Sequence, residues 1–87
     1  MDKAIYLIER QAYRKELVAN LTQKDLEEWV ADESYTDNYT ILKIDASDYD
    51  TADDALRGEV GYMLTCGDDA VSELQDDYYV FTFGFVG

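Results

Sequence analysis

Carboxylates are the side chains with which this chain could do chemistry. One group lies between residues 45 and 59, and a second lies between residues 68 and 77. Carboxylate oxygens bind divalent cations, transfer protons and attract basic surfaces. The acidic candidates are Asp45, Asp48, Asp50, Asp53, Asp54, Asp68, Asp69, Glu73, Asp76 and Asp77.

Calcium binding is the first chemistry that the earlier group suggests. An EF-hand loop that starts at Asp48 would place Asp50 at its third position and Glu59 at its twelfth, where calcium needs oxygen ligands. The fifth position is Ala52, which has no side-chain oxygen, and the sixth is Asp53, where the loop needs glycine. A magnesium site made of two or three of these carboxylates would be unspecific. We therefore expect no metal ion and interpret the group as an Asp-rich turn before a helix, whose N-terminus favours anions.

The composition also argues against catalysis. Adjacent acids on a helix do not face each other, and adjacent acids on a strand point to opposite faces. The chain has no His, the commonest general base and metal ligand. Its single cysteine, Cys66, forms neither an internal disulfide nor a cysteine-type zinc site. We expect no catalytic residue and no cofactor; a metal-dependent enzyme that uses Asp carboxylates is the weakest alternative.

The charge is high and unevenly placed along the chain. Seven residues are Lys or Arg and twenty are Asp or Glu, which gives a net charge of −13. Residues 1–24 carry a net charge of +2, and residues 25–87 carry −15. This distribution argues against direct binding of nucleic acid and against docking on an anionic membrane. It predicts instead that the acidic candidates form a surface for a protein partner with a basic surface.

The function that we expect is therefore a non-catalytic, acidic protein–protein interaction module. Its eight Tyr residues supply rigid amphipathic contact area. The alternative is a nucleic-acid mimic that blocks a DNA- or RNA-binding protein, because spaced carboxylates can imitate phosphates. In size and charge the chain is similar to small phage-encoded inhibitors of restriction or CRISPR systems. Mimicry predicts one elongated band of carboxylates, whereas a general module predicts scattered acids and a patch of Tyr and Phe.

The hydropathy of the chain predicts a cytoplasmic protein. No apolar run is long enough to span a membrane. The apolar stretch near the N-terminus turns charged again at Glu9 and Arg10, so it is too short for the core of a signal peptide.

The elements that must position these side chains begin with a strand. Residues 4–9 are apolar on both faces, which predicts a central strand, with a helix as the alternative. Residues 11–20 are ambiguous, and the spacing by four of their apolar residues favours a short helix. Thr22 and Asp25 have the spacing of a capping box, so a helix should start there and run to about Ala31. This helix would bury Leu26, Trp29 and Val30.

The second half repeats the alternation of strand and helix. After a polar loop over residues 34–38, the β-branched residues 39–45 predict a strand. Thr51 is a good N-cap for a helix over residues 52–65, although two glycines lie inside it. Residues 68–75 predict one more short helix.

Residues 77–86 give the clearest strand pattern. Alternation places one aromatic row on a single face: Tyr79, Phe81, Phe83 and Phe85. The row is either core beneath the helices or an exposed face for self-association. Because the other face of this strand is also apolar and a chain of this length has few helices to cover two faces, we expect a homodimer.

The whole chain, residues 1–87, is expected to form a single acidic α+β domain. Its fold would be a small two-layer sandwich of about three strands, in the order β-α-β-α-β. Two or three helices would cover one face of the sheet.

Overall fold

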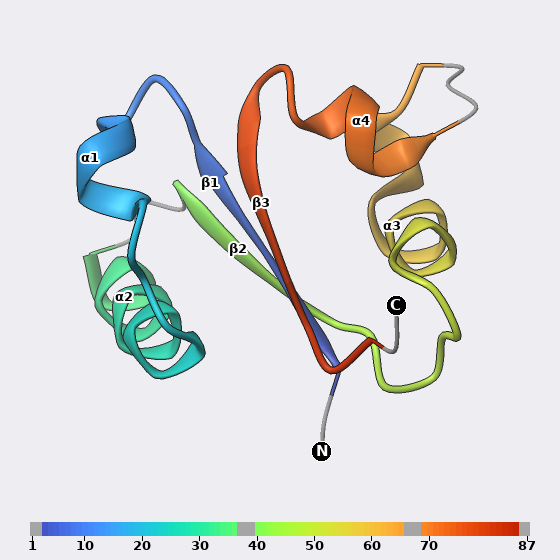
Figure 1. The fold of residues 1–87 in the computed structure, drawn as a ribbon, viewed down its shortest axis with the longest axis horizontal. Helices are drawn as coiled ribbons and strands as arrows, with labels where there is room; N and C mark the ends of the chain where they lie inside the picture. Colours follow the sequence, from blue (N-terminus) through green and yellow to red (C-terminus); the bar gives the residue numbers. More distant parts are fainter. Residues whose placement is uncertain (1–2, 37–39, 66–68, 86–87) are drawn as a thin grey trace.

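The computed structural model describes residues 3–36, 40–65 and 69–85. In this part of the chain three strands form one antiparallel sheet in the order β2-β1-β3, and helices lie on either side of it (Figure 1). The elements in chain order are β1 (Ala4–Glu9), α1 (Lys15–Val18), α2 (Gln23–Thr36), β2 (Ile41–Asp45), α3 (Ala52–Val60), the 3₁₀ turn η1 (Gly61–Met63), α4 (Ala70–Leu74) and β3 (Tyr78–Phe83).

Strand β1 is central, as its apolar composition predicted, and each of its neighbours is an edge strand. In the register, Tyr6 lies opposite Lys43 of β2 and opposite Phe81 of β3. Residues 4–8 are all buried, because β1 is paired on both sides and covered on both faces. The α+β class and the three strands are therefore confirmed.

The position of the helices differs from the sequence-based prediction. Instead of covering one face, α1 and α2 lie on one face of the sheet and α3 and α4 on the other, as Figure 1 shows. The physical reason is that β1 presents buried apolar side chains to both faces, and each face needs its own cover. The result is two separate hydrophobic cores.

The two cores have different compositions. We call the cluster on the side of α2 the α2 core; its buried members are Ala4, Tyr6, Ile8, Val18, Leu26 and Ile41. We call the other the α3/α4 core; its buried members are Ile5, Leu7, Ile44, Ala46, Ala55, Leu56, Val60, Ala70 and Leu74. The odd and even residues of β1 are thus divided between the two cores, as the alternation of a strand requires.

The capping box before α2 is confirmed. The backbone N–H of Asp25 donates to Thr22 Oγ1 at 3.2 Å, and the backbone N–H of Thr22 donates to Asp25 Oδ2 at 3.1 Å. The helix runs to Thr36, beyond the predicted end at Ala31, so residues 34–36 are helical and not part of a loop. Leu26 is fully buried, whereas Trp29 and Val30 are only half-buried against the α2 core.

The helices of the second half are shorter than predicted. Thr51 caps α3, accepting a hydrogen bond from the N–H of Asp54 at 3.1 Å, but α3 ends at Val60 and continues only as the turn η1. Helix α4 starts at Ala70. The predicted strand at the C-terminus ends at Phe83, because Gly84 adopts a positive φ of 87° that turns the chain.

The turn at Gly84 corrects one prediction about the aromatic row. Tyr79, Phe81 and Phe83 pack against the α2 core, as one face of β3 should. Phe85 packs instead against the α3/α4 core, on the opposite face of the sheet. Strict alternation fails there because a glycine with a positive φ reverses the direction in which the next side chain leaves the strand.

Candidate functional site

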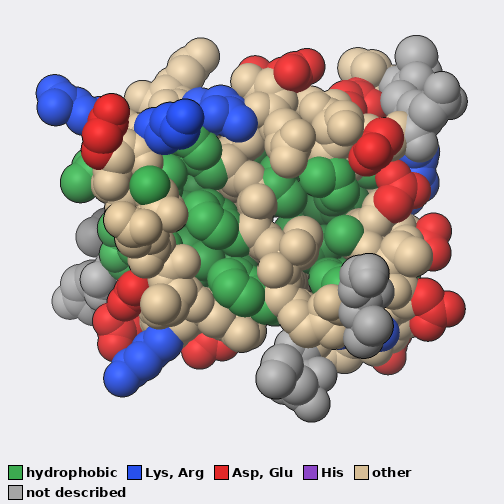
Figure 2. Space-filling view, in the orientation of Figure 1, with side chains coloured by type: hydrophobic (Ala, Val, Ile, Leu, Met, Phe, Trp, Pro, Cys, Tyr) green, Lys and Arg blue, Asp and Glu red, His purple; other side chains and the backbone are tan. Residues whose placement is uncertain are grey.

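Acidic side chains collect on the side of the molecule that α3 and α4 form. Figure 2 shows them along the right of the view, where Figure 1 places these two helices, whereas the left of the view carries Lys and Arg as well as Asp and Glu. Residues 46–77 contain ten acidic residues and a single basic one, Arg57. This separation of charge is a property of the fold as well as of the sequence, because the basic N-terminal segment leads to α1 and α2 on the other face.

Five of the predicted candidates are exposed, and their carboxylates make no hydrogen bond or ion pair with another described residue. Two precede α3, one lies in its first turn, and two follow α4. We call this set the acidic flank: Asp48, Asp50, Asp54, Asp76 and Asp77. These carboxylates are available to a partner at no cost to internal contacts.

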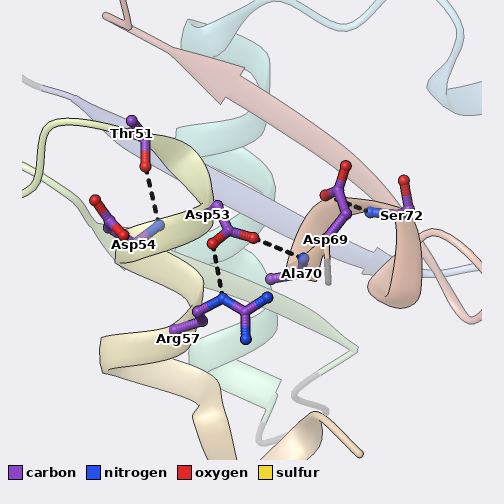
Figure 3. A network of polar contacts seen from close by, with 7 residues as sticks. All are labelled: Thr51, Asp53, Asp54, Arg57, Asp69, Ala70 and Ser72. Carbon is purple, nitrogen blue, oxygen red and sulfur yellow. Dashed lines mark hydrogen bonds and ion pairs between the residues drawn. The ribbon is translucent and has the colours of Figure 1, made fainter. Parts of the chain in front are cut away.

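Asp53 is not free in this way, because it connects the two helices of the flank. Its Oδ1 accepts a hydrogen bond from the N–H of Ala70 at 2.7 Å, and its Oδ2 accepts one from Arg57 Nε at 2.7 Å (Figure 3). The Arg57 guanidinium, followed by the Ala70 N–H, holds the pKa of this carboxyl below its ordinary value. Asp53 therefore joins α3 to the first residue of α4 and is a structural residue.

Three further candidates also bind within the chain. Asp69 caps α4, accepting from the N–H of Ser72 at 3.2 Å. Glu73 Oε1 accepts from Thr65 Oγ1 at 2.6 Å. Asp45 accepts from the N–H of Ser47 at 3.0 Å, and this backbone hydrogen bond is the main reason why the pKa of Asp45 is lowered.

The carboxylates spread along the flank and do not converge. Among the described residues, no group of three or more Asp, Glu or Cys side chains lies close enough to hold a metal ion. The remaining candidate, Asp68, and the cysteine, Cys66, lie outside the described residues. The described carboxylates form a charged surface, and Asp76 and Asp77 also line two pockets of about 270 and 430 Å³ next to the start of β3.

A groove of about 680 Å³ between α2 and β2 collects basic side chains but is not an anion site. Lys3, Lys24 and Lys43 line it together with Glu27 and Asp45. Lys43 Nζ lies 3.5 Å from Glu27 Oε1, and Lys3 Nζ donates to the carbonyl oxygen of Tyr49 at 2.7 Å. Glu27 and Asp45 offset two of the three positive charges, so the groove carries little net charge.

The predicted self-association face is divided by the fold. Tyr79, Phe81 and Phe83 are half-buried on the face of the α2 core, and Phe85 lies on the other face. The Arg10 guanidinium carbon lies 4.5 Å from the ring centroid of Tyr79, which covers part of the row. What sequence reasoning missed is that Tyr79, Phe81 and Phe83 belong to an edge strand, β3, whose backbone is open on one side.

Comparison of the chain with family models, with curated proteins and with solved structures gave no match. In the described part of the chain, no helix has both the length and the apolar character that crossing a membrane requires.

Proposed function

We propose that this protein is a non-catalytic interaction module that binds a basic surface of another protein through the acidic flank. The observation that carries the proposal is the set of five exposed carboxylates that make no hydrogen bond or ion pair with another described residue and that lie before and within α3 and after α4. The proposed place of action is the cytoplasm, as expected from the sequence.

The physical basis is long-range attraction between opposite charges. A surface with one sign of charge steers a complementary partner into contact and raises the association rate by a factor of about 10 to 1,000. Exposed charges are screened over about 8 Å at physiological ionic strength, so binding should weaken steeply when salt is added. Because the flank carboxylates form no hydrogen bond within the described part of the chain, they can approach basic side chains without breaking one there.

The experiment compares two variants that remove the same amount of charge from opposite sides. Asp50→Asn with Asp76→Asn removes two charges from the acidic flank, and Glu16→Gln with Glu28→Gln removes two from α1 and α2. Immobilised protein is used to capture partners from an extract of the source cells at low and high salt. At low salt, we expect the flank variant to capture less partner than the natural protein, and the α1/α2 variant to capture as much. High salt should reduce capture of the partner by the natural protein. Equal capture by both variants, or capture that resists salt, would refute the role of the flank.

The second candidate is nucleic-acid mimicry, which is a more specific use of the same flank. It is favoured by the way the carboxylates extend along one side instead of clustering, since duplex DNA presents one charge per roughly 1.7 Å of its axis. Competition separates the two candidates. If a DNA or RNA duplex displaces the protein from its captured partner, the partner's nucleic-acid groove is the target. A partner with no affinity for nucleic acid would exclude mimicry and leave the interaction module.

A further inference from the structure

We propose that a second copy of this chain pairs in antiparallel direction with the outer edge of β3, so that the two sheets join into one continuous sheet. This inference concerns the edge of the sheet at β3, which two residues of the acidic flank, Asp76 and Asp77, precede in the chain. In this proposal the surface of self-association is the backbone edge of β3, instead of the aromatic face that the sequence predicted.

The direction of the backbone groups of β3 follows from one hydrogen bond near its start, from a second one on the other side of β1, and from the register. The N–H of Arg10 donates to the carbonyl of Asp77 at 3.0 Å, so this pair is hydrogen-bonded. In an antiparallel ladder, hydrogen-bonded and non-hydrogen-bonded pairs alternate. The next hydrogen-bonded pairs along the register are Ile8 with Tyr79 and Tyr6 with Phe81. On the other side of β1, the N–H of Glu9 donates to the carbonyl of Thr40 at 3.0 Å, which fits the same alternation.

Three residues of β3 therefore direct their backbone N–H and C=O groups away from β1: Tyr78, Val80 and Thr82. No other described residue forms a hydrogen bond with these groups. Figure 1 shows β3 nearest the viewer, with no described element in front of it, and Figure 2 shows hydrophobic side chains on both sides of its backbone. The edge thus offers both an open ladder of hydrogen-bonding groups and apolar contact area.

The opposite edge of the sheet shows what a protected edge looks like in the same molecule. The outward residues of β2 include Lys43 and Asp45, which are both exposed and charged. Charged side chains, Lys above all, discourage pairing at a sheet edge. Strand β3 (Tyr78–Phe83) has no charged residue, although the chain as a whole is 31% charged. Of the two edge strands, β3 is thus the one without charged side chains.

One register satisfies every outward group. It places Val80 opposite Val80 of the partner subunit and Tyr78 opposite Thr82 of the partner subunit, and each such pair exchanges two hydrogen bonds. The two-fold axis then passes through the Val80 pair. On the face of the α2 core, Tyr79 lies opposite Phe81 of the partner subunit, and aromatic cross-strand pairs of this kind are favourable.

Charges at the two ends of β3 favour the antiparallel direction. Asp76 and Asp77 precede the strand, and Lys3 lies beside its end, with Nζ 5.9 Å from the ring centroid of Phe85. Antiparallel pairing brings the acidic start of one strand to the lysine beside the end of the other, whereas parallel pairing would bring the two acidic starts together. The net charge of −13 on each copy opposes association at long range, so added salt should strengthen the dimer.

The test measures mass and amide exchange over a range of protein and salt concentrations. Light scattering should show the mass rising from 10.0 kDa toward twice that value as protein and salt increase. In the dimer, exchange of the amides of Tyr78, Val80 and Thr82 should slow by about tenfold or more, since they become hydrogen-bonded. The outward amides of Ile41 and Lys43 on β2 are internal controls and should not change.

A matched pair of variants locates the interface. Thr82→Pro removes an outward N–H from β3, and Lys43→Pro removes an outward N–H from β2; both side chains are exposed, and proline is tolerated at edge positions of this kind. We expect Thr82→Pro to abolish the rise in mass and Lys43→Pro to leave it intact, with folding of each variant checked by circular dichroism. If Thr82→Pro unfolds the protein, the amide-exchange comparison in the natural chain decides.

Two results would overturn the proposal. One is a mass of 10.0 kDa at every protein and salt concentration. The other is a dimer in which the β3 amides exchange as fast as in the monomer, because the interface would then lie elsewhere. Added salt should strengthen the dimer but should release the partner of the acidic flank. Failure of the dimer proposal can therefore be told apart from failure of the proposed function.

Discussion

Gly58 and Gly61 provide a matched test of how α3 packs against the preceding loop. A Cβ at residue 58 would lie 2.8 Å from Cε1 and from Cζ of the Tyr49 ring, whereas a Cβ at residue 61 would meet nothing within 4 Å. The Tyr49 ring also packs against the α3/α4 core, and its hydroxyl donates to Glu59 Oε1 at 3.1 Å. The lack of a side chain at Gly58 therefore lets this ring lie against α3.

The two substitutions should have opposite signs. Replacing a helical Gly by Ala stabilises by about 0.5–1 kcal/mol, because glycine loses more backbone freedom on folding. At Gly61 this gain should appear in full. At Gly58 the new methyl group displaces the Tyr49 ring, and overpacking of this kind costs about 1–3 kcal/mol. The expected net effect of Gly58→Ala is a loss of up to about 2.5 kcal/mol in the free energy of unfolding.

The assay is urea unfolding followed by circular dichroism, in a double-mutant cycle with Tyr49→Ala. Tyr49→Ala removes the ring, so Gly58→Ala should stabilise in that background by about the same amount as Gly61→Ala does in the natural chain. The reasoning would be refuted if Gly58→Ala stabilised the natural chain, or if it destabilised both backgrounds equally.

Three further substitutions test the local structure. Thr22→Ala should cost about 1 kcal/mol of unfolding free energy through the lost cap of α2; an unchanged urea midpoint would contradict the capping box. The lowered pKa of Asp53 means that its contribution to stability is present above its ordinary pKa and is lost as the pH falls through the lowered folded-state value. Unfolding measured from neutral to acidic pH should therefore show a steeper loss for the natural chain than for Asp53→Asn, and parallel curves would count against this role. Gly84→Ala should cost about 1–2 kcal/mol because φ is positive there; a thermal midpoint equal to that of the natural chain would argue against the turn.

The strands and helix starts could be predicted because they depend on residues close together in the sequence. Thr22 and Thr51 cap their helices through hydrogen bonds to residues three positions away, and such spacing is visible in the sequence. Helix ends were predicted less well. Helix α2 passes Ala31, and α3 stops at Val60 although the helical spacing of apolar residues continues to Leu64.

The acidic candidates could be listed from the sequence but not separated into structural and available carboxylates. Asp53 and Asp54 are adjacent and look equivalent in the sequence. Asp53 reaches the N–H of Ala70, which is 17 residues away, while the Asp54 carboxylate stays exposed. This difference depends on the contact between α3 and α4, which the local sequence pattern does not contain.

The sequence by itself determined the α+β class, the excess of negative charge, the lack of imidazole and the central strand β1, because each of these follows from composition or from near neighbours in the chain. Only the tertiary structure decided that helices cover both faces of the sheet, that Phe85 leaves the aromatic row, and that β3 is an edge with an open backbone. Alternation specifies the two faces of a strand but carries no information about its two edges. Which edge stays open depends on pairing between segments more than 70 residues apart, such as Ala4 with Phe83.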